Sequence, residues 1–159
     1  MERREFLRRA GAVLGALSML GLGSGAALAL PISETRAMPR EDADHPRERR
    51  YPIPVADAVS IDRDNSVIIA RVSGRVYAFS LNCPHQNTSL RWDDEDQQFH
   101  CPKHKSRYGP TGTFIEGRST RDMDRLAIRR DGAAVLVDVD ALYQEDLNPT
   151  EWSAAFVAV

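Results

Sequence analysis

The sequence is poor in several informative residue types, and each scarcity narrows what the protein can be. Only two of its 159 residues are cysteines, so a site that uses both leaves none over. Aromatic residues make up only 7% of the chain, which fits a small β-rich domain. The net charge of −2 lacks the basic excess by which proteins bind nucleic acid, so nucleic acid is not an expected partner.

The chain also lacks the signatures of an enzyme that acts alone. It contains no paired base and nucleophile and no glycine-rich phosphate loop, and 159 residues leave no domain large enough for a substrate cleft. Internal repeats and low-complexity segments are absent as well. The length allows one folded domain and an N-terminal leader. We therefore expect a component of an oxidoreductase system rather than a stand-alone catalyst.

What the chain does have is a histidine close to each cysteine. Cys83 and His85 form a Cys-x-His motif, and after fifteen intervening residues Cys101 and His104 form Cys-x-x-His. Thiolate and imidazole are the ligands preferred by borderline-soft metals. Each segment supplies one ligand of each kind, whereas a zinc finger groups its cysteines in one loop and its histidines on one helix. The order suits a two-iron cluster with two thiolates on one iron and two imidazoles on the other.

This spacing resembles the Rieske [2Fe-2S] family. The resemblance implies one cluster per chain, with Cys83 and Cys101 on the buried iron. It places His85 and His104 on the outer iron, near solvent. The implied function is the transfer of single electrons. A structural zinc site built from the same four residues, in a binding module without redox activity, is the alternative interpretation.

Two polar residues that follow the second histidine match further positions of the family. In its high-potential members the serine at the position of Ser106 bonds to a bridging sulfide, and the tyrosine at the position of Tyr108 bonds to a cysteine sulfur. Such donors withdraw electron density and favour the reduced cluster. The alternative is that both are polar residues of a turn. The resemblance implies a potential in the middle of the Rieske range of roughly −150 to +300 mV.

The sequence departs from the respiratory members of the family. Their second cysteine in each loop forms a disulfide, but Thr88 and Lys103 stand at those positions, and Gln86 replaces a leucine. The expected third loop, near residues 116–120, contains no proline. These departures favour a small redox subunit, as in the resemblance to arsenite oxidase, or a free Rieske-type ferredoxin over a quinol-oxidising subunit. The implied partners are a redox donor and acceptor, such as a c-type cytochrome or a larger oxidoreductase subunit.

The amino terminus resembles a twin-arginine export signal. Arg3 and Arg4 precede Phe6 and Leu7, and residues 10–30 carry no charge. A small-residue triplet ending at residue 29 is typical of a cleavage site. The uncharged stretch also reaches the length of about 20 residues that spans a bilayer. The sequence predicts a periplasmic protein, which is either soluble after cleavage or tethered to the cytoplasmic membrane by an uncleaved signal.

We predict four segments: a signal or anchor over residues 1–30, a flexible linker over 31–50, a Rieske domain over 51–145 and a C-terminal tail over 146–159. The part that binds the cluster is expected at about residues 82–112. The predicted fold class is all-β, a Rieske-like antiparallel β-sandwich or barrel with a subdomain of two cluster-binding loops.

Local patterns predict the individual strands. Two prolines confine residues 51–55 to a sheet edge, since proline lacks the ladder donor. Alternating runs joined by turn residues predict hairpins over 66–80, 90–100 and 126–139. The second hairpin carries an acidic turn at 93–96, which is expected to be solvated or, less simply, to dock a basic partner. A short helix is expected to begin near Asn148.

Overall fold

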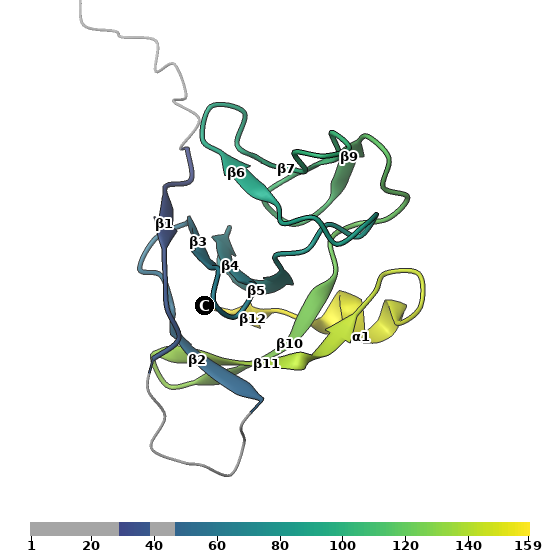
Figure 1. Cartoon of the computed structure of the whole chain (residues 1–159). Helices are drawn as coiled ribbons and strands as arrows, with labels where there is room; N and C mark the ends of the chain where they lie inside the picture. Colours follow the sequence, from purple (N-terminus) through teal and green to yellow (C-terminus); the bar gives the residue numbers. More distant parts are fainter. Residues whose placement is uncertain (1–28, 39–46) are drawn as a thin grey trace, which may run out of the picture.

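The structure is a computed structural model that describes residues 29–38 and 47–159. These residues form two β-sheets, with the small one above the large one in the view of Figure 1. The large sheet is strongly curled and has eight strands, and the small sheet has four. Strands predominate over a single short helix in the described ranges. The predicted all-β fold is therefore confirmed.

The strands of the large sheet lie in an order that brings distant segments together. Along the sheet the order is β1 (Ile32–Glu34), β3 (Ala58–Asp62), β4 (Val67–Val72), β5 (Arg75–Ser80), β10 (Arg125–Asp131), β11 (Ala134–Tyr143) and β2 (Glu48–Pro52). Strand β12 (Val157–Ala158) pairs with β5 off this path. The small sheet has the order β6 (Arg91–Asp93), β7 (Gln98–His100), β8 (Arg107–Tyr108) and β9 (Phe114–Glu116). Helix α1 (Pro149–Ala154) follows β11.

Strands β4 and β5 are buried on both faces and separate two hydrophobic clusters. Because successive side chains of a strand point to opposite faces, alternate residues enter different clusters. Tyr77 and Phe79 pack on the side of the small sheet, whereas Val76 and Ala78 pack inside the curl of the large sheet. Phe79 meets Phe99 of β7 edge-on, with ring centroids 6.2 Å apart. This contact joins the two sheets.

The local patterns predicted the hairpins correctly. Strands β4 and β5, β6 and β7, and β10 and β11 pair antiparallel. Strand β2 lies at an edge of the large sheet, as the prolines required. The helix α1 begins directly after Asn148, with Pro149 in its first turn, where the missing N–H is not needed.

The range 31–50 differs from the predicted linker wherever the structure describes it. Strand β1 pairs parallel with β3, with Ile32 opposite Val59, and Met38 forms a bridge to Arg50. Leu30 is 93% buried in the cluster beneath the small sheet, since only 7% of it is exposed. The charged composition suggested a mobile segment, but main-chain pairing with β3 does not depend on apolar side chains.

The C-terminal tail is part of the fold rather than an appendage. Arg125 stacks on the Trp152 ring, with its guanidinium carbon 3.7 Å from the ring centroid, and Trp152 Nε1 donates to the Met123 carbonyl at 2.9 Å. Strand β12 then joins β5. The apolar C-terminal end therefore packs on the domain. In the part of the chain that the structure describes, no helix is long and apolar enough to cross a membrane. Residues 1–28 of the signal or anchor predicted over 1–30 lie outside the described residues.

Candidate metal centre

The two segments that carry the Cys/His motifs fold into loops of the same design. In the first, the Asn87 amide donates to the Cys83 carbonyl and the Cys83 amide donates to the Thr88 carbonyl, both at 2.9 Å. In the second, eighteen residues further on, Lys105 and Ser106 make the same bonds to Cys101, at 3.0 and 2.8 Å. Each loop therefore wraps its main chain around one cysteine.

Both loops depend on one residue with a positive φ, the backbone conformation that side chains generally disfavour. Asn87 has φ 51° and Lys105 has φ 58°, four residues after their respective cysteines. This conformation turns each amide back toward the cysteine carbonyl. Asparagine adopts it at moderate cost, and lysine adopts it at a greater cost that the hydrogen bonds of the loop offset.

The two thiols lie in the interior, at the inner end of the site. Cys83 is fully buried and Cys101 is 2% exposed. Burial raises the pKa of the Cys83 thiol, while a hydrogen bond from Tyr108 lowers it and the neighbouring Cys101 thiol raises it. The Tyr108 hydroxyl lies 3.4 Å from Cys83 Sγ. Burial also raises the pKa of Tyr108, so its phenol keeps its proton and can donate to the sulfur.

The two histidines converge at the surface end of the site. His85 Nδ1 and His104 Nδ1 lie 3.1 Å apart, and the rings meet edge-on with centroids 4.6 Å apart. Both side chains are half-buried. Burial lowers the pKa of His104, and the positive charges of His85, Lys103 and Arg118 lower it further. Neutral imidazole is the form that binds a metal.

The four side chains thus form two pairs rather than one tetrahedral set. Two thiols meet in the interior, and two imidazole nitrogens meet near the surface. A single zinc ion, at about 2.0–2.3 Å from each ligand atom, requires all four to surround one point. Among residues 29–38 and 47–159, the three-ligand group with all ligand atoms within 4.8 Å lies elsewhere, at the acidic turn. The donor set fits a two-iron cluster and disfavours the structural zinc interpretation.

Ser106 lies where the second loop meets the segment expected to form the third loop. Its hydroxyl oxygen accepts the amides of Arg118 and Ser119, each at 3.1 Å. Ser106 is fully buried. The Ser106 hydroxyl also hydrogen-bonds the Tyr108 side chain, so the predicted bond to a sulfide stays a prediction.

Gly117 permits this contact, and sequence reasoning gave it no role. Its φ is +112°, and an added Cβ would lie 2.4 Å from Ser106 Cα and 2.7 Å from the Lys105 carbonyl oxygen. No other residue type fits there without moving the second ligand loop. The turn glycines in the sequence gave no signal that distinguished Gly117, because the requirement comes from a neighbouring loop.

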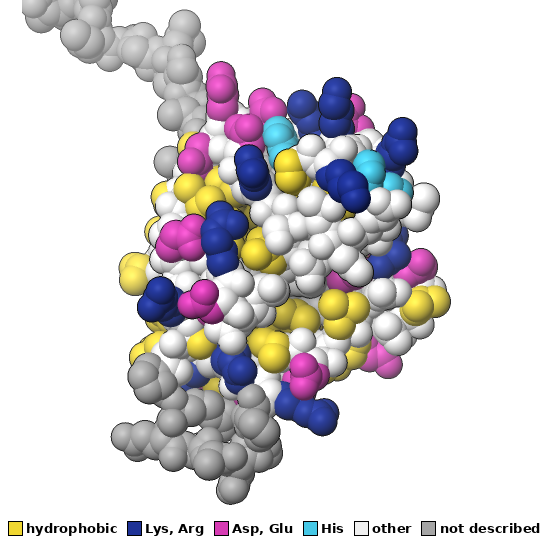
Figure 2. All heavy atoms as spheres, in the orientation of Figure 1, with side chains coloured by type: hydrophobic (Ala, Val, Ile, Leu, Met, Phe, Trp, Pro, Cys, Tyr) yellow, Lys and Arg dark blue, Asp and Glu magenta, His cyan; other side chains and the backbone are white. Residues whose placement is uncertain are grey.

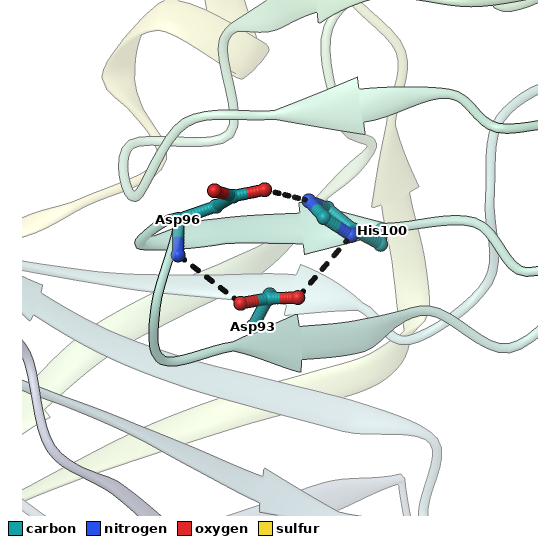
Figure 3. A group of neighbouring side chains, drawn as sticks. All are labelled: Asp93, Asp96 and His100. Carbon is teal, nitrogen blue, oxygen red and sulfur yellow. Dashed lines mark hydrogen bonds and ion pairs between the residues drawn. The ribbon is translucent and has the colours of Figure 1, made fainter.

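A second cluster of potential ligands occupies the acidic turn between β6 and β7 (Figure 3). His100 Nδ1 lies 3.6 Å from Asp93 Oδ2, and His100 Nε2 lies 3.6 Å from Asp96 Oδ2. The two carboxylates approach different ring nitrogens, whereas one metal ion would bind one of them. Arg107 already lies 3.4 Å from Asp96 Oδ2 and supplies a positive charge. This group is therefore a set of polar contacts around the hairpin turn rather than a metal site.

Comparison with known proteins identifies the family. The model of the Rieske [2Fe-2S] domain family matches residues 48–129, just over half of the chain. The cytochrome b6-f complex iron-sulfur subunit of Chlorobaculum thiosulfatiphilum is 28% identical over 46% of this chain and 41% of its own length. A cytochrome b6-f complex iron-sulfur subunit of a Nostoc species is 25% identical over 50% of this chain and 52% of its own. The chain thus spans about half the length of these relatives.

Among solved structures, the plasma membrane Rieske protein of Synechocystis is 24% identical and has a TM-score of 0.41. The match covers 57% of this chain and 85% of that one. The family match includes both ligand loops and the strands that present them. The chain belongs to the Rieske [2Fe-2S] domain family and carries a Rieske-type [2Fe-2S] cluster.

Proposed function

We propose that this protein is an exported carrier of single electrons, acting as a small subunit or partner of a membrane or periplasmic redox complex. The observation that supports this most is the layering of the candidate site. Two thiols lie in the interior, and two imidazoles reach the surface with their Nδ1 atoms 3.1 Å apart. An electron carrier needs this layering, because its redox group must be shielded from water and still come close to a partner.

Each candidate ligand has a distinct role in this proposal. Cys83 and Cys101 hold the inner iron, and His85 and His104 hold the outer iron. The bound cluster supplies a one-electron redox couple. Burial keeps water from the thiolates. Tyr108 donates to the Cys83 sulfur, which withdraws electron density and raises the reduction potential.

The partner is a redox protein, and two features bear on its identity. The relatives named above are iron-sulfur subunits of cytochrome b6-f complexes, which supports a complex that contains a cytochrome. Gln86, Thr88 and Lys103 depart from the pattern of quinol-oxidising subunits. The departures support a small redox subunit of the arsenite-oxidase-like kind, and the relatives support a quinol–cytochrome c reductase-like setting. A free Rieske-type ferredoxin is the alternative.

Protein-film voltammetry tests the electron-transfer role. The folded, iron-loaded protein should give a reversible one-electron wave within the Rieske range of roughly −150 to +300 mV. A folded protein that binds metal and gives no wave would contradict the proposal. A wave near the lower limit would favour the ferredoxin alternative.

Export is tested separately by cell fractionation. Residues 1–28 lie outside the described residues, so this part of the proposal rests on the sequence. Replacing Arg3 and Arg4 by lysine should leave the protein in the cytoplasm, because the twin-arginine route reads the paired arginines. Replacing Arg8 and Arg9 by lysine is the matched control and should preserve export. Equal export of both variants would contradict the twin-arginine route.

A further inference from the structure

Three exposed positive charges lie near the two candidate histidine ligands. Lys103 and Lys105 flank His104 in the second loop, and Arg118 lies in the adjoining loop. All three side chains are exposed. Among the residues that the structure describes, none of these three forms an ion pair. The first ligand loop, residues 82–89, carries no charge of either sign.

Two arginines close to this region do form ion pairs. Arg107 pairs with Asp96 at 3.4 Å and with Glu116 at 3.2 Å. Arg121 pairs with Asp124 at 3.0 Å. Arg107 and Arg121 are thus neutralised within the fold, whereas Lys103, Lys105 and Arg118 are not; Arg91 on β6 also forms no ion pair among the described residues. Exposed like charges repel one another and gain nothing from the fold, so their placement points to an external anion.

Residue type also distinguishes the two lysines of the second ligand loop from the other basic residues. Lys103 and Lys105 are the only lysines of the chain, whose other 19 basic residues are arginines. An ammonium group is a compact, strongly hydrated point charge, whereas a guanidinium forms directional pairs with carboxylates. Lysines around the site suit a contact that forms and dissociates quickly, as an electron carrier requires.

Charges of opposite sign lie next to this region on the same end of the molecule. Figure 2 shows dark blue side chains beside cyan ones in the upper part of the view, with a separate magenta group to their left. The acidic turn at residues 93–96 accounts for four carboxylates on the small sheet. Part of their charge is already neutralised by Arg107. The end of the molecule that presents the histidines is therefore polarised.

We propose that Lys103, Lys105 and Arg118 form a docking rim around His85 and His104 for an acidic redox protein. This inference rests on the proposed function and deepens it by naming the partner's chemistry: carboxylates surrounding the exposed edge of its redox group. Such a rim accelerates encounter and orients the partner toward the histidines. The net charge of the whole chain, −2, would instead favour a basic partner. The net charge and the local charge of the rim therefore predict partners of opposite sign.

Binding to two c-type cytochromes, one with an acidic and one with a basic surface, separates these predictions. Both proteins are kept oxidised, so that titration calorimetry reports binding and no electron transfer. The acidic cytochrome should bind more tightly than the basic one at low salt. Its affinity should fall about tenfold or more between roughly 10 and 200 mM salt, since exposed charges are screened over that range. Tighter binding of the basic cytochrome would overturn the proposal.

A matched pair of triple variants locates the contact. Replacing Lys103, Lys105 and Arg118 by glutamine should lower the affinity for the acidic cytochrome about tenfold or more at low salt. Replacing the exposed Arg36, Arg91 and Arg130 by glutamine removes the same charge elsewhere and should change the affinity less than about threefold. Equal losses in both variants would show that only net charge matters and would overturn the proposal.

Two further measurements keep the test independent of the cluster and of folding. Arg118→Gln leaves both ligand loops unchanged and should by itself produce part of the loss. Voltammetry of each variant tests the electron-transfer role separately. A normal wave together with an unchanged affinity for the acidic cytochrome would overturn the docking rim and leave the electron-transfer role standing. Preferential binding to vesicles that contain anionic lipid, with no cytochrome binding, would assign the rim to a membrane surface and overturn the proposal as well.

Discussion

Tyr108 shows at the residue scale how one side chain links the fold to the expected redox chemistry. It belongs to the short strand β8 and is fully buried, with its ring edge-on to Phe114 at 5.8 Å between centroids. This packing fixes the phenol 3.4 Å from Cys83 Sγ. The hydroxyl can therefore donate its proton to the sulfur of Cys83, a candidate cluster ligand.

Replacing Tyr108 by phenylalanine should keep the cluster and lower its reduction potential by about 40 mV. This follows because one hydrogen bond contributes about 1 kcal/mol, and 59 mV corresponds to about 1.4 kcal/mol for one electron. Voltammetry of the purified variant measures the shift. An unchanged potential would show that Tyr108 does not bond to a ligand sulfur of the cluster.

Gly117 is the residue whose backbone the site depends on most directly. Gly117→Ala should destabilise the protein by more than about 3 kcal/mol and reduce cluster content, since the new Cβ would collide with the main chain of the second ligand loop. Gly132→Ala is the matched control, because Gly132 also has a positive φ, +60°, but no heavy atom lies within 4 Å of an added Cβ.

The control should cost only about 1–2 kcal/mol. Chemical denaturation gives both free energies of unfolding, and the iron content per chain reports the site. Similar costs for the two variants would mean that the close approach of Gly117 to Ser106 contributes nothing.

At the scale of elements, local patterns predicted the hairpins but did not predict the pairing of strands that lie far apart in the sequence. Alternation in β4 and β5 and the turn between them are encoded within fifteen residues, so the sequence is sufficient there. Strand β1 has a polar sequence and pairs with β3, whose partner residues lie 27 positions away. No local pattern encodes that register. The same holds for β12 on β5.

A glutamine side chain ties the start of the described chain to the small sheet. Leu30 donates its amide to Gln97 Oε1, and Gln97 Nε2 donates to the Leu30 carbonyl at 3.4 Å. Gln97, directly after the acidic turn, thereby helps to hold the arm of residues 30–38 in place.

Gln97→Ala should speed hydrogen exchange of the Thr35 and Ala37 amides about tenfold. Losing these two bonds costs the docked arm about 1–2 kcal/mol, and 1.4 kcal/mol is a factor of ten in opening. Gln98→Ala is the neighbouring control and should leave the arm's exchange unchanged. Equal protection in the wild type and the Gln97→Ala variant would show that β1 is held by its pairing with β3 alone.

At the scale of the whole molecule, Asp62 ties its own turn to two segments that lie earlier in the chain. Its carboxylate accepts the Ala37 amide at 3.1 Å, the Tyr51 hydroxyl at 3.0 Å and the Asn65 side-chain amide at 2.8 Å. Asp62 is 1% exposed. Burial alone would raise the pKa of Asp62, but these hydrogen bonds outweigh it and hold the pKa below its usual value.

This lowered pKa makes part of the protein's stability depend on pH. Asp62 contributes stability above its unfolded pKa of about 3.9 and loses that contribution as the pH falls through its lower folded value. Asp62→Asn should cost about 1–3 kcal/mol at pH 7. The difference between wild type and variant should shrink below about pH 4, as measured by urea denaturation at several pH values. A difference that does not vary with pH would contradict this account.

The sequence predicts part of the candidate site, namely its ligand residues, and does not predict the contacts between its loops. The ligand types and their spacing are properties of the chain itself, so Cys83, His85, Cys101 and His104 were found from sequence. Whether they act as ligands stays a prediction. The matching hydrogen bonds of the two loops, the support of Ser106 by the 117–119 segment and the unneutralised rim appear only when the loops are placed in space.

The most direct test of the ligand set is pulsed electron paramagnetic resonance of the reduced protein, with its four histidines labelled with nitrogen-15. Two strongly coupled nitrogens are expected, because one iron of the cluster takes two imidazoles. His100→Gln should leave both couplings in place, whereas His104→Ala should remove the native signal. No strong nitrogen coupling in the wild type, or an unaltered signal from the His104→Ala variant, would contradict a cluster held by these residues.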